Sequence, residues 1–293
     1  MLKKFALILF VTIFTGCSMR PGYYAEDLQI QKMAEPAEAK TSEAETVPQT
    51  ALVPLGSDVS PGLRQLPVGE KLVFSIRWLG LEAGRTTVTI KEIVKINGRD
   101  CYHIQAFTRT TYILDLLFRI RDYHDTYVDT EGFYSHRFVK RASEGELSYD
   151  ETNDFDYVQN KAFYTNKRKN ESKVTDLPGK VQDIVSVSYW FRSQDVKVGD
   201  SVKAYLHSDE KNYDVTISVL NKEEFKADGK DQVPVMVIEP KLQRGNKPYK
   251  KGRGKIWVTD DAERLPLFAE AHVIIAGTLN IVLLSKENIY ANK

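Results

Sequence analysis

The residues best suited to chemistry in this sequence are the aspartates and histidines between positions 122 and 136. Asp122, His124, Asp125 and Asp129 lie in one short segment, and His136 follows it. Residues two apart in a β-strand point to the same face, so Asp122 and His124 could share a metal ion or a proton. Their spacing matches no closed metal-binding motif, and a solvated strand face with cross-strand hydrogen bonds is the simpler interpretation. We therefore predict neither a metal site nor a hydrolase here.

A second pair, Cys101 and His103, also shares one face of a predicted strand, which could suit nucleophilic catalysis. No third residue is placed to orient the histidine, so we expect a half-buried thiol beside a surface histidine. The run Gly252-Arg253-Gly254-Lys255 lacks the glycine spacing and the following helix of a phosphate-binding loop. The sequence therefore predicts a protein that is not an enzyme and that carries no cofactor.

Two other segments contain side chains that could bind an amphiphile. One is a dense apolar run from Tyr112 to Phe118, and the other, from Lys241 to Lys255, is strongly basic. Apolar side chains can contact acyl chains, and basic ones can contact phosphate headgroups or lipopolysaccharide. The predicted ligand-binding residues are Tyr112, Leu116, Leu117, Phe118, Lys247, Lys250, Lys251 and Arg253. The alternatives are a helix that covers the core, a solvated loop, or a contact with another protein.

An internal duplication gives these two segments equivalent positions. Val68-Gly69-Glu70 is repeated as Val198-Gly199-Asp200, 130 residues later. Three further matches follow at nearly the same offset: Asn97-Gly98 with Asp228-Gly229, Tyr102–Ala106 with Val233–Val237, and Asp129-Thr130-Glu131 with Asp260-Asp261-Ala262. Four matches in the same order are difficult to attribute to chance. We predict that residues 67–175 and 198–293 are two copies of one β unit.

Each copy has the pattern of an antiparallel β meander. Leu72, Phe74, Ile76 and Trp78 alternate with polar or smaller residues, as in a half-buried strand. Similar runs recur at short spacing between turn residues, which predicts an all-β fold with about six strands in each half. Alone, each half would expose an apolar face, so we expect the halves to form one curved or barrel-like sheet assembly or two packed sheets. One short helix, beginning near Asp183 within residues 176–197, is predicted between them.

The N-terminus has the pattern of a bacterial lipoprotein precursor. Lys3-Lys4 precede an apolar run that ends at Thr15-Gly16-Cys17. A basic start, a short apolar run and small residues before a cleavage point form a secretory signal, and the run is shorter than the about 20 apolar residues of a membrane span. We expect residues 1–17 to be a signal peptide and Cys17 to be lipidated; an ordinary cleaved signal is the alternative. Residues 18–66, rich in Ala, Glu, Ser, Thr and Pro, are predicted to be a disordered tether.

Several spaced motifs together resemble the domain of unknown function 3108 family of bacterial envelope proteins. They are Leu66-Pro67-Val68-Gly69-Glu70, Trp78–Gly84, Arg121–Asp129, Gln182–Ser186, Trp257–Asp260 and Arg264-Leu265-Pro266. The resemblance extends from about Leu66 to the C-terminus and implies an exported, β-rich protein without a known activity. By similarity to lipoprotein sorting, Ser18 after Cys17 favours the outer membrane.

These observations predict an outer-membrane lipoprotein that faces the periplasm and binds a lipid or glycolipid in an apolar concavity, for envelope transport or maintenance. The alternative is a non-catalytic interaction or assembly module that contacts an envelope protein partner. The formal net charge of +1 gives no reason to expect a nucleic-acid partner. The expected membrane contact is the lipid anchor at Cys17.

Overall fold

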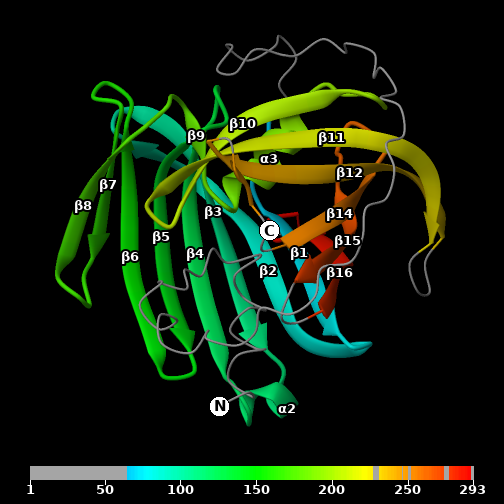
Figure 1. Ribbon diagram of the computed structural model, residues 1–293. Coiled ribbons are helices and arrows are strands. Elements are labelled where there is room, and N and C mark those ends of the chain that lie inside the picture. The colour runs from blue at the N-terminus through cyan, green and yellow to red at the C-terminus, as the bar shows by residue number, and fades with distance from the viewer. Residues whose placement is uncertain (1–64, 227–230, 246, 250–251, 274–276, 292–293) are drawn as a thin grey trace, which may run out of the picture.

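A computed structural model describes residues 65–226, 231–245, 247–249, 252–273 and 277–291 (Figure 1). The predicted signal peptide, Cys17 and nearly all of the predicted tether lie outside the described residues, as do Lys250 and Lys251. The fold begins slightly earlier than predicted. Leu66, assigned to the tether, is buried among residues of the first half, and its backbone N–H donates to the Tyr102 hydroxyl at 3.2 Å.

The first half is an antiparallel meander in which each strand pairs with the next along the chain. Its strands are β1 (Glu70–Trp78), β2 (Leu81–Ile96), β3 (Arg99–Thr110), β4 (Ile120–Asp129), β5 (Ser135–Glu144), β6 (Leu147–Asp156), β7 (Lys161–Asn166) and β8 (Glu171–Asp176). A four-residue helix, α2 (Tyr112–Asp115), lies between β3 and β4. The prediction of about six strands was too low for this half, because β7 and β8 form an additional hairpin.

A two-residue strand, β9 (Val181–Gln182), and the helix α3 (Ser186–Ser193) lie between the halves. The second half then repeats the meander with the strands β10 (Ser201–Ser208), β11 (Lys211–Lys226), β12 (Gln232–Arg244), β13 (Lys247–Pro248), β14 (Gly252–Thr259), β15 (Pro266–Val273) and β16 (Gly277–Asn288). β1 pairs with β16, so both halves belong to a single curved sheet of 16 strands. Pairing is antiparallel except between β9 and β10.

The two halves have the same order of strands. β1 to β6 correspond to β10, β11, β12, β14, β15 and β16, and the long strands β2 and β11 each contain 16 residues. The strand register shifts at Tyr127/Val128 in the first half and at Trp257/Val258, 130 residues later, in the second. Phe133 and Arg264 both have positive φ, at 52° and 44°. The predicted duplicated meander is therefore confirmed.

The turn that opens each half is also repeated in its hydrogen bonds. Gly69 and Gly199 have φ values of +93° and +92°, which a residue with a side chain rarely adopts. Gly69 N–H donates to Ile90 O at 2.8 Å, and Gly199 N–H donates to Val219 O at 2.9 Å. The repeated sequence Val-Gly-Glu/Asp thus encodes a turn that ties the start of one strand to the middle of the next.

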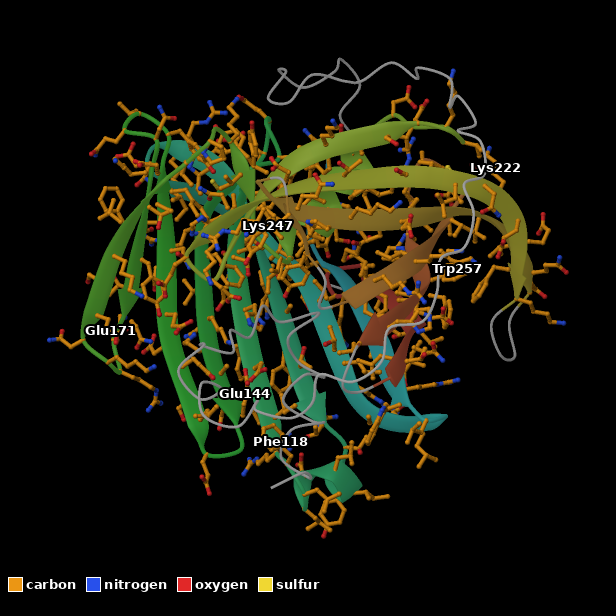
Figure 2. The ribbon with its side chains drawn as sticks, viewed as in Figure 1. Phe118, Glu144, Glu171, Lys222, Lys247 and Trp257 are labelled. Atoms are coloured by element: carbon orange, nitrogen blue, oxygen red, sulfur yellow. The ribbon has the colours of Figure 1, made fainter. Side chains whose placement is uncertain are left out.

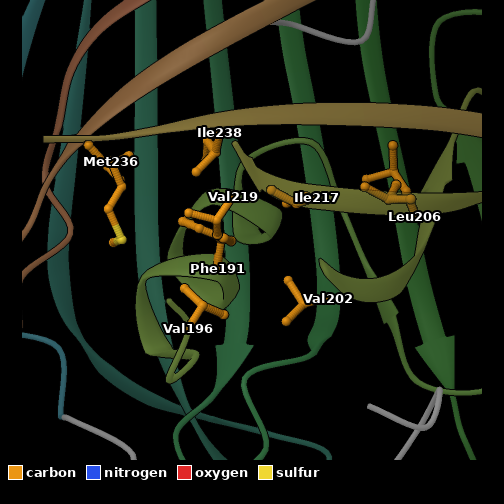
Figure 3. Close-up of a cluster of buried hydrophobic side chains, with 10 residues drawn as sticks. Phe191, Val196, Val202, Leu206, Ile217, Val219, Met236 and Ile238 are labelled. Carbon is orange, nitrogen blue, oxygen red and sulfur yellow. The ribbon is translucent and has the colours of Figure 1, made fainter. Parts of the chain in front are cut away.

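The helix α3 lies between the two halves, as predicted. Tyr189 packs into the first-half cluster, which contains Ile90, Tyr102, Ile104, Val128 and Phe133. Phe191 packs into the second-half cluster, which contains Val202, Leu206, Ile217, Val219, Met236 and Ile238 (Figure 3). Trp190 contacts both clusters. Asp183 precedes the helix and is fully buried; its Oδ1 accepts hydrogen bonds from the N–H groups of Val185 and Ser186.

The two halves also meet where β8 ends the sheet. The Lys173 ammonium forms an ion pair with Glu210, and the Asn212 amide donates to Asp176 O at 2.6 Å. Glu210 and Asn212 belong to the turn between β10 and β11 and to the start of β11, so the second half covers part of the edge of the first with side chains. Neither helix among the described residues is long and apolar enough to cross a membrane.

Candidate functional site

The predicted apolar segment forms an exposed protrusion at one end of the first half. The exposed fractions of Tyr112, Ile113, Leu116 and Leu117 are between 74% and 81%. Leu114 points the other way and packs against the core residues around Ile76 and Leu279. A helix that covers the core was one of the alternatives predicted for this segment. The segment does contact the core, through Leu114 and through the half-buried Phe118, while Tyr112, Ile113, Leu116 and Leu117 face solvent.

Polar contacts at the base fix this protrusion in place. Thr111 N–H donates to Ala83 O at 3.0 Å, and Phe118 N–H donates to Leu114 O at 2.7 Å. The Asp115 carboxylate accepts from both Thr110 Oγ1 and the Arg121 guanidinium. The hydrogen bond from Arg121 lowers the pKa of Asp115 below its usual value. The exposed apolar residues are thus held on an ordered support.

The neighbouring turns add exposed leucines at the same end of the sheet. In a meander every second turn lies at one end, so the β1–β2 turn, the α2 segment and the β5–β6 turn are neighbours (Figure 1). Gly145 N–H, in the β5–β6 turn, donates to Arg119 O at 2.8 Å. We call the exposed apolar residues of this end the apolar rim: Leu79, Leu81, Tyr112, Ile113, Leu116, Leu117 and Leu147.

A row of three arginines lies beside the apolar rim on the outer face of the sheet. Arg85 of β2 is directly opposite Arg109 of β3, which is directly opposite Arg121 of β4. The face is the outer one, because Thr108 and Thr110, which flank Arg109, are buried while Arg109 is exposed. We call these three residues the arginine row. Like charges placed directly opposite each other destabilise a sheet.

The remaining predicted ligand-binding residues do not join this surface. Phe118 is half-buried and packs against Ile120 beneath the protrusion. Lys247 and Arg253 are exposed in the second half, and Figure 2 shows Lys247 far from Phe118. The duplication thus gives the two segments equivalent places in their halves but does not bring them together.

The outward-facing aspartates of β4 make the predicted cross-strand hydrogen bonds, but they are buried, so the prediction of a solvated face was wrong. His103 Nε2 and Gln105 Nε2 each lie 2.8 Å from Asp125 Oδ1, and Arg141 contacts its other oxygen. Burial alone would raise the pKa of Asp125, but these three partners lower it to about 2. The alternating pattern did not reveal this burial, because long neighbouring side chains cover the carboxylate.

Asp129 is fixed in the same way at the other end of β4. It accepts two hydrogen bonds from Arg99, at 2.9 and 3.0 Å, and one oxygen lies 3.1 Å from His136 Nε2. Its Oδ1 also accepts from the N–H groups of Glu131 and Gly132. Burial opposes ionisation, but these partners hold the pKa of Asp129 well below its usual range. Asp129 is therefore a structural turn residue.

Asp122 and His124 face the interior of the sheet, where Lys140 and Glu144 of β5 are also buried. The Lys140 ammonium lies 3.5 Å from Glu144 Oε1 and 4.1 Å from the centre of the Tyr149 ring. Burial and the nearby Glu144 carboxylate raise the pKa of Asp122 well above its usual value. Among the described residues, no three His, Cys, Asp or Glu side chains are arranged to hold a metal ion.

Cys101 also differs from its prediction, because it is completely buried rather than half-buried. Its thiol contacts Arg99 O, and burial raises the pKa of the thiol to about 12. A buried, protonated thiol is a poor nucleophile. His103, on the same face, pairs with Asp125 instead.

A small polar pocket lies between the halves. Lys140, Glu151 and Tyr164 line it from the first half, and His207 and Glu210 line it from the second. Its volume of about 30 Å³ holds about two water molecules and is too small for an acyl chain. This pocket is not the apolar concavity expected from the sequence. The apolar rim is instead a group of exposed apolar side chains at one end of the sheet.

The comparisons with known proteins agree with this architecture. The family model described as Protein of unknown function (DUF3108) matches residues 73–283, which is most of the chain. The chain belongs to this family. The match begins in β1 and ends in β16, so the DUF3108 region includes both copies of the meander and the helix between them. No curated protein matches the sequence.

Among solved structures, a beta-barrel-like protein of the DUF1849 domain from Brucella abortus is similar in fold. The TM-score is 0.52 and the identity 11%, over 75% of this chain and 97% of that one. A protein from Bacteroides fragilis with a YmcC-like fold has a TM-score of 0.29 and 8% identity, over 77% of this chain and 98% of that one. A candidate lipoprotein from Parabacteroides distasonis has a TM-score of 0.30 and 9% identity, over 79% and 100%. Only the first is similar enough to support the fold, and it supports nothing beyond the fold.

Sequence reasoning missed Leu79, Leu81 and Leu147 of the apolar rim, and all of the arginine row. These residues are far apart in the chain and become neighbours only through strand pairing. One available signal was the position of the leucines beside turns, where polar residues are usual. The β1–β2, β3–β4 and β5–β6 connections carry them, whereas the β7–β8 turn at the same end consists of Lys167, Arg168, Lys169 and Asn170.

Proposed function

We propose that this protein is an outer-membrane-anchored periplasmic lipoprotein that binds an amphiphile, a lipid or a glycolipid, through the apolar rim. The observation that supports this proposal is the gathering of seven exposed large apolar side chains at one end of the sheet. Single exposed hydrophobic residues are normal on protein surfaces, but contiguous groups mark interaction sites. Such a protein would serve transport or maintenance of the envelope.

The energetic argument favours contact with acyl chains. Removing a leucine-sized side chain from water gains roughly 1.5–3 kcal/mol, so even part of the apolar rim would bind significantly. The gain is not reduced by a large ordering cost, because Leu114, Asp115 and Arg121 already hold the protrusion. A chain anchored at Cys17 would keep this surface near a membrane at all times.

Lipid extraction and mass spectrometry on the gently purified full chain test this proposal. We expect co-purified acyl lipids in the unchanged protein and their loss in the double variant Leu116→Ser/Leu117→Ser. Val158→Ser is the matched control, because Val158 is 95% exposed in the β6–β7 turn at the opposite end of the meander. Equal lipid content in all three proteins, or none in the unchanged protein, would refute amphiphile binding by the rim.

The alternative is a non-catalytic interaction module, and one observation favours it. Within the part of the chain that the structure describes, β8 pairs with β7 alone, and Val174 on β8 is largely exposed, so a partner strand could add to this edge. The edge is nevertheless short and charged, and Glu210 and Asn212 cover part of it. Both features usually protect an edge from pairing. A lipid-free protein that co-purifies with a stable protein partner would support this alternative.

A further inference from the structure

We propose that the arginine row, Arg85, Arg109 and Arg121, binds the phosphate groups of anionic phospholipids at the surface of the bilayer that the apolar rim enters. This inference rests on the proposed function, because it requires the rim to meet a lipid bilayer. It goes beyond that function by naming the class of lipid and the residues that select it.

The first argument is the unbalanced charge within the row. Arg85 Nε lies 2.8 Å from Glu82 Oε1, and the Arg121 guanidinium pairs with Asp115. Arg109, between them, has no carboxylate partner among the described residues. Three guanidinium groups side by side on adjacent strands repel one another. A phosphate between them would accept charge-assisted hydrogen bonds and remove that repulsion.

The charged residues around the arginine row also carry a net positive charge. Arg77 lies directly opposite Glu82 on the neighbouring strand, and Arg119 precedes β4 at the end of the α2 segment. The carboxylate of Glu144 does not offset the row, because it is buried in the interior of the sheet. In the β1–β2 turn, the α2 segment, the β5–β6 turn and the strand ends beside them, the charged residues other than Glu144 are Arg77, Arg85, Arg109, Arg119 and Arg121 on one side and Glu82, Asp115 and Glu146 on the other. The outer face beside the apolar rim is thus net positive.

The second argument is the distance between the row and the rim. Arg109 is the penultimate residue of β3, and the exposed residues of the protrusion begin at Tyr112. At about 3.3 Å per strand residue, the row lies within about 10 Å of the protrusion. Apolar faces of surface-bound proteins enter a bilayer by about 5–10 Å, which is the depth of the headgroup and acyl boundary. Arginine side chains can extend along this boundary and keep the guanidinium at the phosphates.

The open shape of the row favours a membrane surface over a small anion. Arg85 is 47% exposed, Arg109 is exposed, and neither lines the small polar pocket between the halves. Free phosphate in solution would therefore gain little from this site. A bilayer brings many phosphates at once and holds them at the height of the row when the rim is inserted.

Hydrogen–deuterium exchange of residues 111–119 in the full-length lipidated chain tests this inference. The chain is reconstituted into vesicles of phosphatidylcholine alone, or of phosphatidylcholine mixed with phosphatidylglycerol. We expect stronger protection in the anionic vesicles, and its loss between about 0.1 M and about 1 M salt, where the Debye length falls from about 10 Å to about 3 Å. Arg109→Gln should reduce the protection on anionic vesicles about five-fold, as expected for one charge near such a surface.

Two further variants separate the possible failures. Lys95→Gln removes one charge from the opposite end of β2 and should leave the protection unchanged. Leu116→Ser should reduce protection on both kinds of vesicle, because it removes part of the apolar rim. If Leu116→Ser acts but Arg109→Gln and lipid charge have no effect, the arginine row is not a headgroup site, although the proposed function stands. If neither vesicle protects the segment, both ideas fail.

Discussion

Glu70 and Arg192 form an ion pair that joins the first strand to the helix between the halves. The two N···O distances are 2.7 and 2.9 Å, and both side chains are almost completely buried. Burial acts to lower the pKa of Arg192, but the hydrogen bonds with Glu70 raise it. Arg192 is therefore charged in the folded protein, and its guanidinium relies on the Glu70 side chain as its buried partner.

Removal of one partner should destabilise the fold strongly. We expect Arg192→Ala to lower the free energy of unfolding by roughly 3–5 kcal/mol, because Glu70 would remain buried without a counter-charge. Chemical denaturation measures this loss. The matched control is Lys71→Ala, which breaks the exposed pair with Glu287 and should have no measurable effect. An equal effect of both substitutions would contradict the account.

Asp122 and Asp125, three residues apart on opposite faces of β4, should respond to pH in opposite directions. Asp125 has a folded-state pKa of about 2, below its unfolded value, so it stabilises the fold above about pH 4 and loses this effect as the pH falls toward 2. Asp122 has a raised pKa, so its ionisation costs stability as the pH rises above about 4.

Denaturation of two variants across the pH range checks these signs. Asp125→Asn should lose about 2 kcal/mol at pH 7, and the difference should shrink below pH 4. Asp122→Asn should be more stable than the unchanged protein at pH 7 and equal to it near pH 4. The same sign for both variants at pH 7 would show that the two carboxylates are not in the different environments described here.

At the scale of single residues, the sequence predicted which side chains share a face of a strand, but not whether that face is buried. The alternation in β4 placed Asp122 and His124 on one face correctly, but it did not show that this face is interior. Nor could it show that Asp125 and Asp129 are enclosed by Arg141 and Arg99, which come from other strands. Burial of a charged residue depends on partners that strand pairing brings, and the local pattern does not contain them.

At the scale of single elements, the paired turns of the duplication give an internally matched experiment. Gly69 and Gly199 have nearly the same φ, but a Cβ at Gly69 would lie 2.6 Å from Asn288 Oδ1 and 2.7 Å from Tyr290 Cδ2. A Cβ at Gly199 would meet no atom within 4 Å. Replacement by alanine therefore causes the same backbone strain at both positions, but it adds a steric clash only at Gly69.

We expect Gly199→Ala to cost roughly 1–2 kcal/mol of stability, from the positive φ alone. Gly69→Ala should cost more, because Asn288 and Tyr290 at the end of β16 would have to move. Thermal or chemical unfolding of the two variants measures the difference. A larger loss for Gly199→Ala would contradict the structural difference between the copies.

The elements themselves were largely predictable. The repeated Val-Gly-Glu/Asp turn, the alternation in β1 and the apolar stripe of α3 are local signals, and each corresponds to an element of the structure. The hairpin of β7 and β8 was not counted, because most of its residues are polar and its pairing lies at the edge of the sheet. The apolar character of residues 112–118 was recognised, but their exposure was not, because only Leu114 and Phe118 are directed inward.

At the scale of the whole molecule, the duplication predicted two similar halves but not how they join. The pairing of β1 with β16 and the position of α3 in both clusters unite them into one sheet. The α2 segment and Lys247 lie apart, although they are equivalent in sequence, because the two copies occupy different parts of the sheet. The functional surface therefore differs between the halves: the first carries the apolar rim and the arginine row.

The most direct test of the account is whether the apolar rim touches a bilayer in the full-length lipidated chain. A fluorophore placed by Leu117→Cys reports on the rim, and one placed by Val158→Cys reports on the opposite end; Cys101 is buried and should not react. In vesicles containing lipids with a quencher on the acyl chain, we predict strong quenching at position 117 and little at position 158. Equal quenching at the two positions, or none at position 117, would contradict the account.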